Sequence, residues 1–482
     1  MDAGRSGSAS KRPDSPDAMT VLERLPAAAR SAAVGLLAAA LFSTAAAAHT
    51  GSLRLGQEPA PVPTWLVVMT GGGVIGMSFL FASLVTDHDL IREINGTGFA
   101  VPLVEGVRSA GRLALRWASV LLLVATVAVG LFGPQEPLSN AAVVLVWAGW
   151  WAGYTTSVYL LGNTWPALNP WRTIAEAVPV GPRRSLPAWI GPWPAVAGLL
   201  GLIWLEVVAP VAGDPRLLSS VVVAYTLVTV GGAVLFGPDS WFGRVDPIAR
   251  VFACYGWIAP VQRTADGVRL RLPGAAAADL EARASADPVF VVAVLWATTY
   301  DGLVSTPAWT AAVEPVVEAG VPARLVYLVA IVAGFGAFLG LYRLGARLVR
   351  RTGDTYLGGA TIADEFATSL LPIAAGYHAA HFLAYFLSLV PALAVLAAAP
   401  FDPPATVPVL AIPDWFGALG LLFILVGHVV AIWIAHSVAF ELFPGRLQPL
   451  RSQYPLVALM IAYTMTSMWI VIQPTVEVPF VG

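Results

Sequence analysis

The chain has 482 residues, of which 57% are hydrophobic and 12% charged, and its formal net charge is −2 at pH 7. This composition excludes an ordinary soluble globular protein, and the near-neutral charge gives no support to a nucleic-acid partner. Apolar runs of about 20 residues recur, each long enough to cross a hydrocarbon core of about 30 Å as a helix. The sequence therefore predicts an all-α, polytopic transmembrane helix bundle in a lipid bilayer.

Residues 1–48 resemble a secretory signal peptide. A polar, basic start is followed by an alanine-rich apolar run that ends immediately before His49. The run is also long enough to be an uncleaved first helix, and the sequence leaves both interpretations open. If cleavage follows Ala48, the free amine and the ring of His49 could chelate one copper ion; otherwise His49 is only the neighbour of a cleavage site.

Ten apolar spans follow the signal-like segment. The first five belong to an N-terminal half, residues 49–237, and the last five to a C-terminal half, residues 288–482. The predicted spans are 64–86, 110–132, 140–161, 190–212, 217–237, 288–304, 323–342, 366–398, 414–441 and 455–473.

Arginine placement predicts the direction of these spans. The loops after the odd-numbered spans contain nineteen arginines, whereas the alternate loops contain three, namely Arg54, Arg216 and Arg324. By the positive-inside rule the arginine-rich loops face the cytoplasm. The sequence thus predicts a multi-pass protein of the cell membrane with the mature N-terminus and the C-terminus outside.

The longest of these loops, residues 238–287, has a pattern of its own. Apolar side chains recur at helical spacing between Ile248 and Ile258, which predicts a helix lying in the membrane interface. Beyond the Asp266-Gly267 turn, Val268 and Leu270 alternate with arginines, which predicts a short hairpin on the cytoplasmic side.

Four of the six histidines lie in two apolar spans of the C-terminal half, where an ionisable side chain is expensive to bury. His378 and His381 are about one helical turn apart and, like His428, lie roughly 20 Å from the predicted cytoplasmic helix ends. His436 lies about 12 Å below His428, too far to share its ion, which suits a group that supports a metal ligand or relays protons. Equal depth favours a metal ion shared by His378, His381 and His428.

Methionines of the last span lie at a similar predicted depth. The side chains of Met465 and Met468 beside imidazoles favour copper over other transition metals, although methionine is also common core filling. A single haem held by His428 and one histidine of the other helix is the competing cofactor, since two axial ligands suffice. Buried histidines that hydrogen-bond across helices or relay protons are the metal-free alternative.

Two carboxylates within the predicted spans are further candidates. Asp301 lies near the outer end of its span and Glu206 lies within another, so either could face a cavity, relay protons or simply satisfy a local hydrogen bond. No nucleophile elbow, zinc-protease motif, nucleotide loop or dinucleotide fingerprint is present in the sequence.

Four segments resemble a family of prokaryotic polytopic membrane proteins whose members commonly carry the label "fenitrothion hydrolase". They are LGNTWPALNPWRT at 161–173, TTYDGLVSTPAW at 298–309, HAAHFLAYF at 378–386 and GHVVAIWIAH at 427–436. The resemblance runs from about residue 48 to 473 and implies organophosphate ester hydrolysis. Thr50 stands where the family pattern prefers glycine.

Three functions stay open at this point. The first is a protein that binds copper or another transition metal in the bundle for transport or redox handling. The second is a metal-dependent membrane hydrolase, which needs an open coordination position and a water-filled access path. The third is a metal-free transporter in which buried histidines relay protons and Glu206 or Asp301 lines the path. The sequence does not identify the small molecule or ion that would be its substrate.

Overall fold

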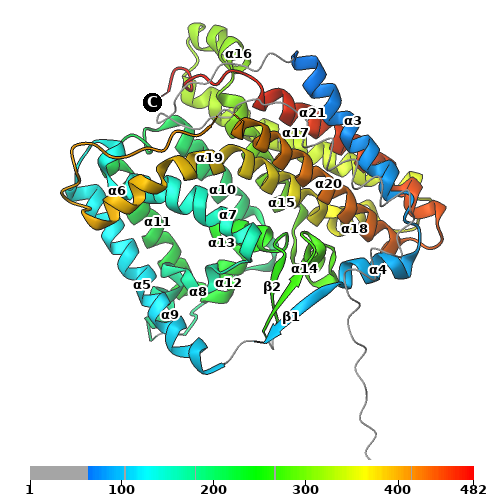
Figure 1. Cartoon of the computed structure of the whole chain (residues 1–482), viewed down its shortest axis with the longest axis horizontal. Helices are drawn as coiled ribbons and strands as arrows, with labels where there is room; N and C mark the ends of the chain where they lie inside the picture. Colours follow the sequence, from blue (N-terminus) through cyan, green and yellow to red (C-terminus); the bar gives the residue numbers. More distant parts are fainter. Residues whose placement is uncertain (1–62, 103–104, 180, 265–266, 414, 482) are drawn as a thin grey trace, which may run out of the picture.

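A computed structural model describes residues 63–102, 105–179, 181–264, 267–413 and 415–481, and it is predominantly helical (Figure 1). The signal-like segment and His49 lie outside the described residues, so cleavage and the N-terminal copper ligand stay predictions. The elements of the N-terminal half are α3 (Thr64–Ala82), α4 (His88–Gly96), β1 (Gly98–Pro102), α5 (Glu105–Phe132), η1 (Pro137–Ser139), α6 (Ala141–Val144), η2 (Leu145–Tyr154), α7 (Thr155–Leu161), α8 (Trp165–Leu168), α9 (Pro170–Ala177), η3 (Ala188–Ile190), α10 (Trp193–Val208) and α11 (Pro215–Phe236).

The second half of the chain begins with short elements and continues with long helices. These elements are α12 (Pro238–Arg244), α13 (Pro247–Gly256), β2 (Val261–Thr264), β3 (Gly267–Arg271), η4 (Ala275–Ala278), α14 (Leu280–Ser285), α15 (Pro288–Val304), α16 (Pro307–Glu318), α17 (Ala323–Thr352), α18 (Gly359–Phe366), η5 (Ala367–Leu370), α19 (Leu371–Ala398), α20 (Phe416–Leu442) and α21 (Leu447–Val471). In Figure 1, α4, α14 and the small sheet lie together at one end of the bundle, and α16 lies at the opposite end.

A recurrent local signal starts several of these helices. An aspartate or threonine caps the first turn and a proline, whose missing N–H is not needed there, occupies the first helical position. Asp214 accepts hydrogen bonds from two backbone N–H groups of α11, and Asp246, Asp287 and Thr306 cap α13, α15 and α16 in the same way. These starts fix where each apolar segment becomes helical.

Seven of the described helices are long and apolar enough to cross a membrane, and an eighth crossing is made if the bent pair α15 and α16 counts as one. The two helices of this pair meet at an angle of 80°. The structure thus confirms a multi-pass membrane bundle, and each of the ten predicted spans is helical over most of its length.

Two predicted spans differ from a regular membrane helix. The segment at 190–212 forms α10, which has 16 residues and ends before Pro210, so it is about 24 Å long and shorter than a hydrocarbon core. The segment at 140–161 is helical throughout, but its centre, η2, is a ten-residue π-helix between α6 and α7. Long π segments are rare and frequently lie at functional sites.

The predicted hairpin is present, and the predicted helix beside it packs into the protein. β2 and β3 pair antiparallel, and β1 adds a third strand in the order β1-β3-β2. The helical pattern at 248–258 forms α13, whose Val251, Phe252 and Tyr255 are all buried inside the protein. This helix packs against α7 and α10. Its position at the membrane interface stays a prediction.

Candidate functional site

All four predicted membrane histidines are buried. The exposed fraction is 1% for His378, 8% for His381 and 0% for His428 and His436. His378 and His381 lie in the first half of α19, where every residue from Leu371 to Phe382 is buried. Burial alone does not bring the rings together, because the direction of each side chain depends on which helix face meets its neighbour.

Glycines form the contact between α19 and α20. A Cβ atom on Gly427 would lie 2.3 Å from the carbonyl oxygen of Pro372, and one on Gly376 would lie 2.4 Å from that of Phe423. Successive residues of a helix are rotated by about 100°, so His378 and His381 lie about 200° and 140° around the axis from Gly376. The two histidines of α19 therefore point away from α20.

The described residues contain no group of three or more His, Cys, Asp or Glu side chains that could hold a metal ion. The shared site predicted for His378, His381 and His428 is therefore not assembled in this arrangement of the described residues. The two methionines face a different helix: the side chain of Met468 lies against Gly71 of α3, and that of Met465 against Gly72.

The two histidines of α20 have local surroundings. The Nδ1 atom of His428 lies 2.9 Å from the carbonyl oxygen of Ile424, one turn earlier, and Nε2 has no partner among the residues that the structure describes. The Nε2 atom of His436 lies 2.8 Å from the carbonyl oxygen of Val85, and its Nδ1 lies 3.3 Å from Oε1 of Gln453. His436 thus links α20 to α21 and to the end of α3.

The structure brings together a different set of candidates. Glu206 of α10, Asp301 of α15 and His378 of α19 line one cavity of about 30 Å³, which we call the acid–histidine cavity. Trp151, Tyr255 and Thr298 are among its other lining residues. A space of this size accepts a water-sized molecule. Three titratable side chains from three predicted spans therefore share one small cavity whose lining is otherwise mostly apolar.

Asp301 also contacts the second histidine of α19. Its Oδ2 atom lies 3.2 Å from Nε2 of His381. His381 in turn lines a further cavity of about 20 Å³ with Ser305, Thr306, Tyr377 and Gln473, which we call the hydroxyl cavity. The Asp301–His381 contact therefore joins a residue that lines the acid–histidine cavity to one that lines the hydroxyl cavity.

His378 is surrounded by aromatic rings. Its ring centre lies 5.9 Å from those of Trp151 and Tyr159 and 4.6 Å from that of Phe382. Neither ring nitrogen has a hydrogen-bond partner among the described residues, and the backbone of Trp151 approaches without reaching hydrogen-bonding geometry. The ring nitrogens are therefore available to whatever enters the acid–histidine cavity.

The break between α15 and α16 lies beside this cluster. Asp301 is one turn before Ser305, where α15 ends and the chain bends. The carbonyl oxygen of Ser305 accepts a hydrogen bond from the N–H of Val476, and the hydroxyl of Thr306 accepts one from the N–H of Trp309. These bonds satisfy backbone groups that have no helical partner where α15 ends and α16 begins.

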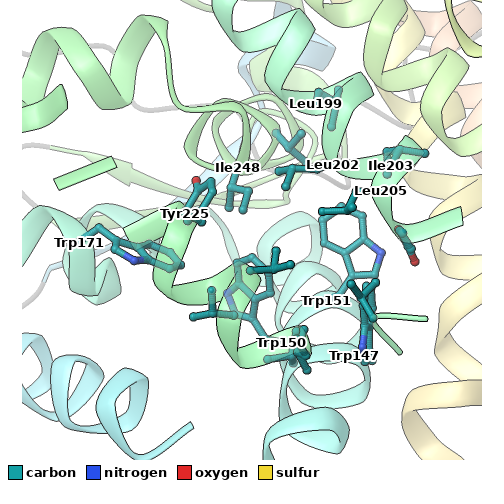
Figure 2. A pocket seen from close by; sticks show the side chains of 17 residues that line it. Trp147, Trp150, Trp151, Trp171, Leu199, Leu202, Ile203, Leu205, Tyr225 and Ile248 are labelled. Carbon is teal, nitrogen blue, oxygen red and sulfur yellow. The ribbon is translucent and has the colours of Figure 1, made fainter. Parts of the chain in front are cut away.

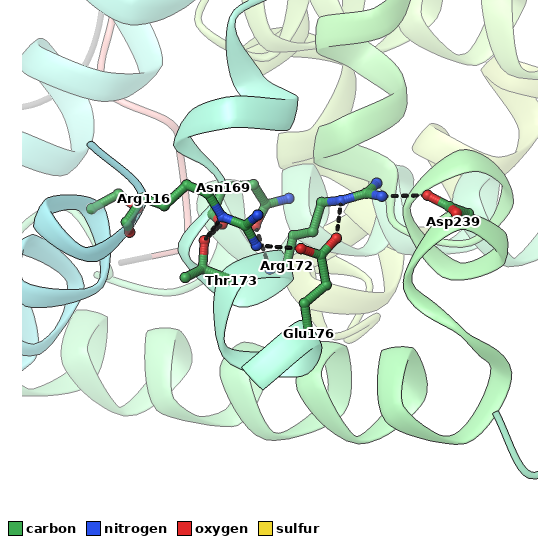
Figure 3. A network of polar contacts seen from close by, with 7 residues as sticks. Arg116, Asn169, Arg172, Thr173, Glu176 and Asp239 are labelled. Atoms are coloured by element: carbon green, nitrogen blue, oxygen red, sulfur yellow. Dashed lines mark hydrogen bonds and ion pairs between the residues drawn. The ribbon is translucent and has the colours of Figure 1, made fainter. Parts of the chain in front are cut away.

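Arg172, in the resembling segment 161–173, belongs to an ion-pair network apart from the acid–histidine cavity (Figure 3). The carboxylate of Glu176 pairs with Arg172 at 2.7 Å and also with Arg116, and Arg172 reaches Asp239. The network connects α5, α9 and α12. Its partly exposed groups suit a structural junction.

The comparisons with known proteins assign no family. No protein-family model, no curated protein and no solved structure matches this chain. Two of the four resembling segments nevertheless meet in space, because TTYDGLVSTPAW supplies Asp301 and HAAHFLAYF supplies its neighbour His381. The hydrolase, copper and haem hypotheses stay predictions.

Sequence reasoning named Glu206, Asp301 and the histidines but not their grouping. It also missed the tryptophans of η2, which line a larger apolar cavity next to the acid–histidine cavity. The run AGWWAGY at 148–154 could have indicated this cavity. Pairs of small residues alternate there with large aromatic ones, a spacing that places the two kinds on different faces of a helix.

Proposed function

We propose that this chain is a proton-coupled transporter of the cell membrane, in which the Asp301–His381 pair carries the coupling proton. The single observation that carries the proposal is the 3.2 Å contact of these two groups beside a cavity that also contains Glu206 and His378. Ionisable side chains within membrane helices are rare, and they commonly mark ion or proton paths.

The pair offers two positions for one proton. When His381 carries it at Nε2, the proton can move to Oδ2 of Asp301, breaking the N–H bond and forming an O–H bond. A proton reaches the pair from the acid–histidine cavity, which Asp301 lines, and leaves toward the hydroxyl cavity, which His381 lines, or it moves in the opposite direction. Glu206 and His378 also line the acid–histidine cavity, so they are further proton-binding groups on that side of the pair.

The bent pair of helices supports a transport role. Interrupted helices with a binding site beside the break are common in secondary transporters, and gating motions use such breaks. Here the break at residues 305–306 is one turn from Asp301. We assign the chain ten crossings, with the arginine-rich loops in the cytoplasm and both termini outside, following the arginine distribution.

The test uses everted membrane vesicles that contain the full chain and are energised by respiration. Solutes from a panel of organic cations, neutral aromatics and organic anions are added while an acridine dye reports the pH gradient. We expect at least one class to dissipate the gradient with the wild-type protein but not with Asp301→Asn.

The matched control is Asp402→Asn, which changes an exposed carboxylate in the loop before α20. This variant should dissipate the gradient as the wild type does. If no solute class moves protons, or if Asp301→Asn moves them at the wild-type rate while present at equal amount in the membrane, the proposed function is wrong.

A further inference from the structure

A second, larger cavity adjoins the acid–histidine cavity. Its volume is about 140 Å³, and it lies between η2, α10, α11 and α13. Figure 2 shows indole rings on one side of it and aliphatic side chains of α10 opposite them. We call it the aromatic cavity; its aromatic lining consists of Trp147, Trp150, Trp151, Trp171 and Tyr225.

The π-helix explains why so many rings face this cavity. On one side of η2, a Cβ atom on Gly153 would lie 2.5 Å from the ring of Phe386, and one on Gly149 would lie 3.3 Å from Leu393, both residues of α19. These glycines let η2 lie close against α19. Trp150 and Trp151, which lie between these glycines, and Trp147, which precedes them, line the aromatic cavity.

One carboxylate faces this aromatic wall. Among the residues that line the aromatic cavity, Glu206 is the only Asp or Glu, and no Arg, Lys or His lines it. Within the described part of the chain, Glu206 has no hydrogen bond or ion pair, and the charged group that acts on it is the like-charged Asp301. It lines the acid–histidine cavity as well, together with Trp151, so the two cavities share a wall.

We propose that the aromatic cavity binds a small monovalent organic cation, with Glu206 as its counter-ion. Tryptophan faces attract cations most strongly among aromatic rings, and desolvation strengthens that attraction. A carboxylate without a partner supplies the opposite charge that a buried cation requires. An anion would instead meet Glu206 as a like charge.

The inference names the substrate class of the proposed transporter and rests on that proposed function. Glu206 can carry either a proton or the cation, and Asp301 and His378 face it across the acid–histidine cavity. Arrival of a cation at Glu206 therefore favours release of a proton toward this cluster. Exchange of one positive charge for another leaves the charge of the site unchanged.

The volume sets the size of the cation. An apolar cavity of about 150 Å³ holds a benzene-sized molecule. The aromatic cavity has a similar volume, so an ammonium group with several short alkyl groups fits, whereas one that also carries an aromatic ring is too large.

The test is calorimetric titration of the full-length protein in lipid nanodiscs with two probes of the same shape. Ethyltrimethylammonium, which has as many heavy atoms as benzene, carries the charge, and 2,2-dimethylbutane replaces its nitrogen by carbon. We expect the cation to bind, and the isosteric variant Glu206→Gln to weaken its binding by about ten-fold or more. The control Asp402→Asn should bind as the wild type does.

Three outcomes overturn the inference. They are no binding of the cation, equal binding of the cation by wild type and Glu206→Gln, and binding of 2,2-dimethylbutane as tight as that of the cation, which would make the cavity merely apolar. Failure of the proposed function is separate. If ethyltrimethylammonium binds through Glu206 but never dissipates the pH gradient in vesicles, the binding site stands and the proton coupling does not.

Discussion

Gly376 of α19 and Gly427 of α20 bring the two histidine-bearing helices into backbone contact. A Cβ atom on Gly427 would lie 3.3 Å from the Cα of Gly376 and 2.3 Å from the carbonyl oxygen of Pro372. A backbone atom cannot rotate away as a side chain can. The contact therefore depends on the absence of a side chain at both positions, and it fixes which faces of α19 and α20 point elsewhere.

The first prediction concerns this crossing. Gly427→Ala should lower the free energy of unfolding by about 1–3 kcal/mol, because the new methyl group forces the helices apart. Gly336→Ala is the control: a Cβ there meets nothing within 4 Å, so alanine's helix propensity should leave stability unchanged or raise it slightly. Thermal unfolding followed by intrinsic fluorescence measures both variants. Equal midpoints for the two would contradict the close crossing.

The second prediction concerns a buried arginine at the end of the bundle where α14 lies. Arg283 has an exposed fraction of 6% and pairs with Glu365 of α18 at 2.5 Å and with Glu441 of α20. Arg283→Met leaves both carboxylates without their cation, and since these are partly exposed we expect a loss of about 1–3 kcal/mol.

The surface pair of Arg92 and Asp89 is the comparison for that variant. Its side chains are 65% and 88% exposed, so Arg92→Met should change stability by less than about 0.5 kcal/mol. Chemical unfolding of the two variants in the same detergent measures the difference. If Arg283→Met and Arg92→Met lower the free energy of unfolding by the same amount, the Arg283 network does not hold α14, α18 and α20 together.

The long helices were predictable because an apolar run of membrane length has few alternatives, and helix starts such as Asp287-Pro288 add a local signal. The β2–β3 hairpin was predictable from alternation and its turn. The place of α13 was not, because periodicity shows that one face is apolar but not what covers it. In the fold, Arg250 on this helix lies 4.2 Å from the ring centre of Phe290, so even its charged side chain packs on protein.

The candidate site was predictable residue by residue but not as a group. Counting along a helix gives the depth of His378 and His428, whereas the rotation of each helix depends on contacts such as that of Gly376 with Gly427. The partner of Asp301 follows from the packing of α15 beside α19, which no local pattern specifies. The prediction of a shared metal site used the depth of each histidine in the bundle but not the rotation of its helix, and the described residues do not assemble that site.

The third prediction is a pH dependence at Asp246, which caps α13 outside the membrane helices. Burial raises the pKa of Asp246 from 3.8 to about 6, although it accepts hydrogen bonds from the hydroxyl of Tyr225 and from the N–H of Ala249. The folded state therefore holds the proton more tightly than the unfolded chain does. This contribution to stability is complete below pH 3.8 and is lost as the pH rises through about 6.

Asp246→Asn keeps a capping oxygen but cannot titrate. The stability of the wild type relative to this variant should decrease as the pH rises from about 4 to about 6 and then stay constant. The total decrease in the free energy of unfolding should be at most about 3 kcal/mol. A series of thermal scans at half-unit steps of pH measures it. A difference that stays constant over this range would mean that the carboxyl keeps its ordinary pKa.

The last prediction tests whether His378 and His428 act on a common metal ion. Their rings leave α19 and α20 in different directions, and their nearest polar neighbours differ: the backbone of Trp151 for His378 and the carbonyl oxygen of Ile424 for His428. Metal–nitrogen bonds of about 2.0 Å would require both rings to converge on one point. After equilibration with equimolar copper and removal of the excess, His378→Ala and His428→Ala should therefore retain as much copper per chain as the wild type does. If both variants instead lose nearly all of their copper while His436→Ala keeps it, the two rings share an ion. In that case α19 and α20 rotate relative to each other when the ion binds.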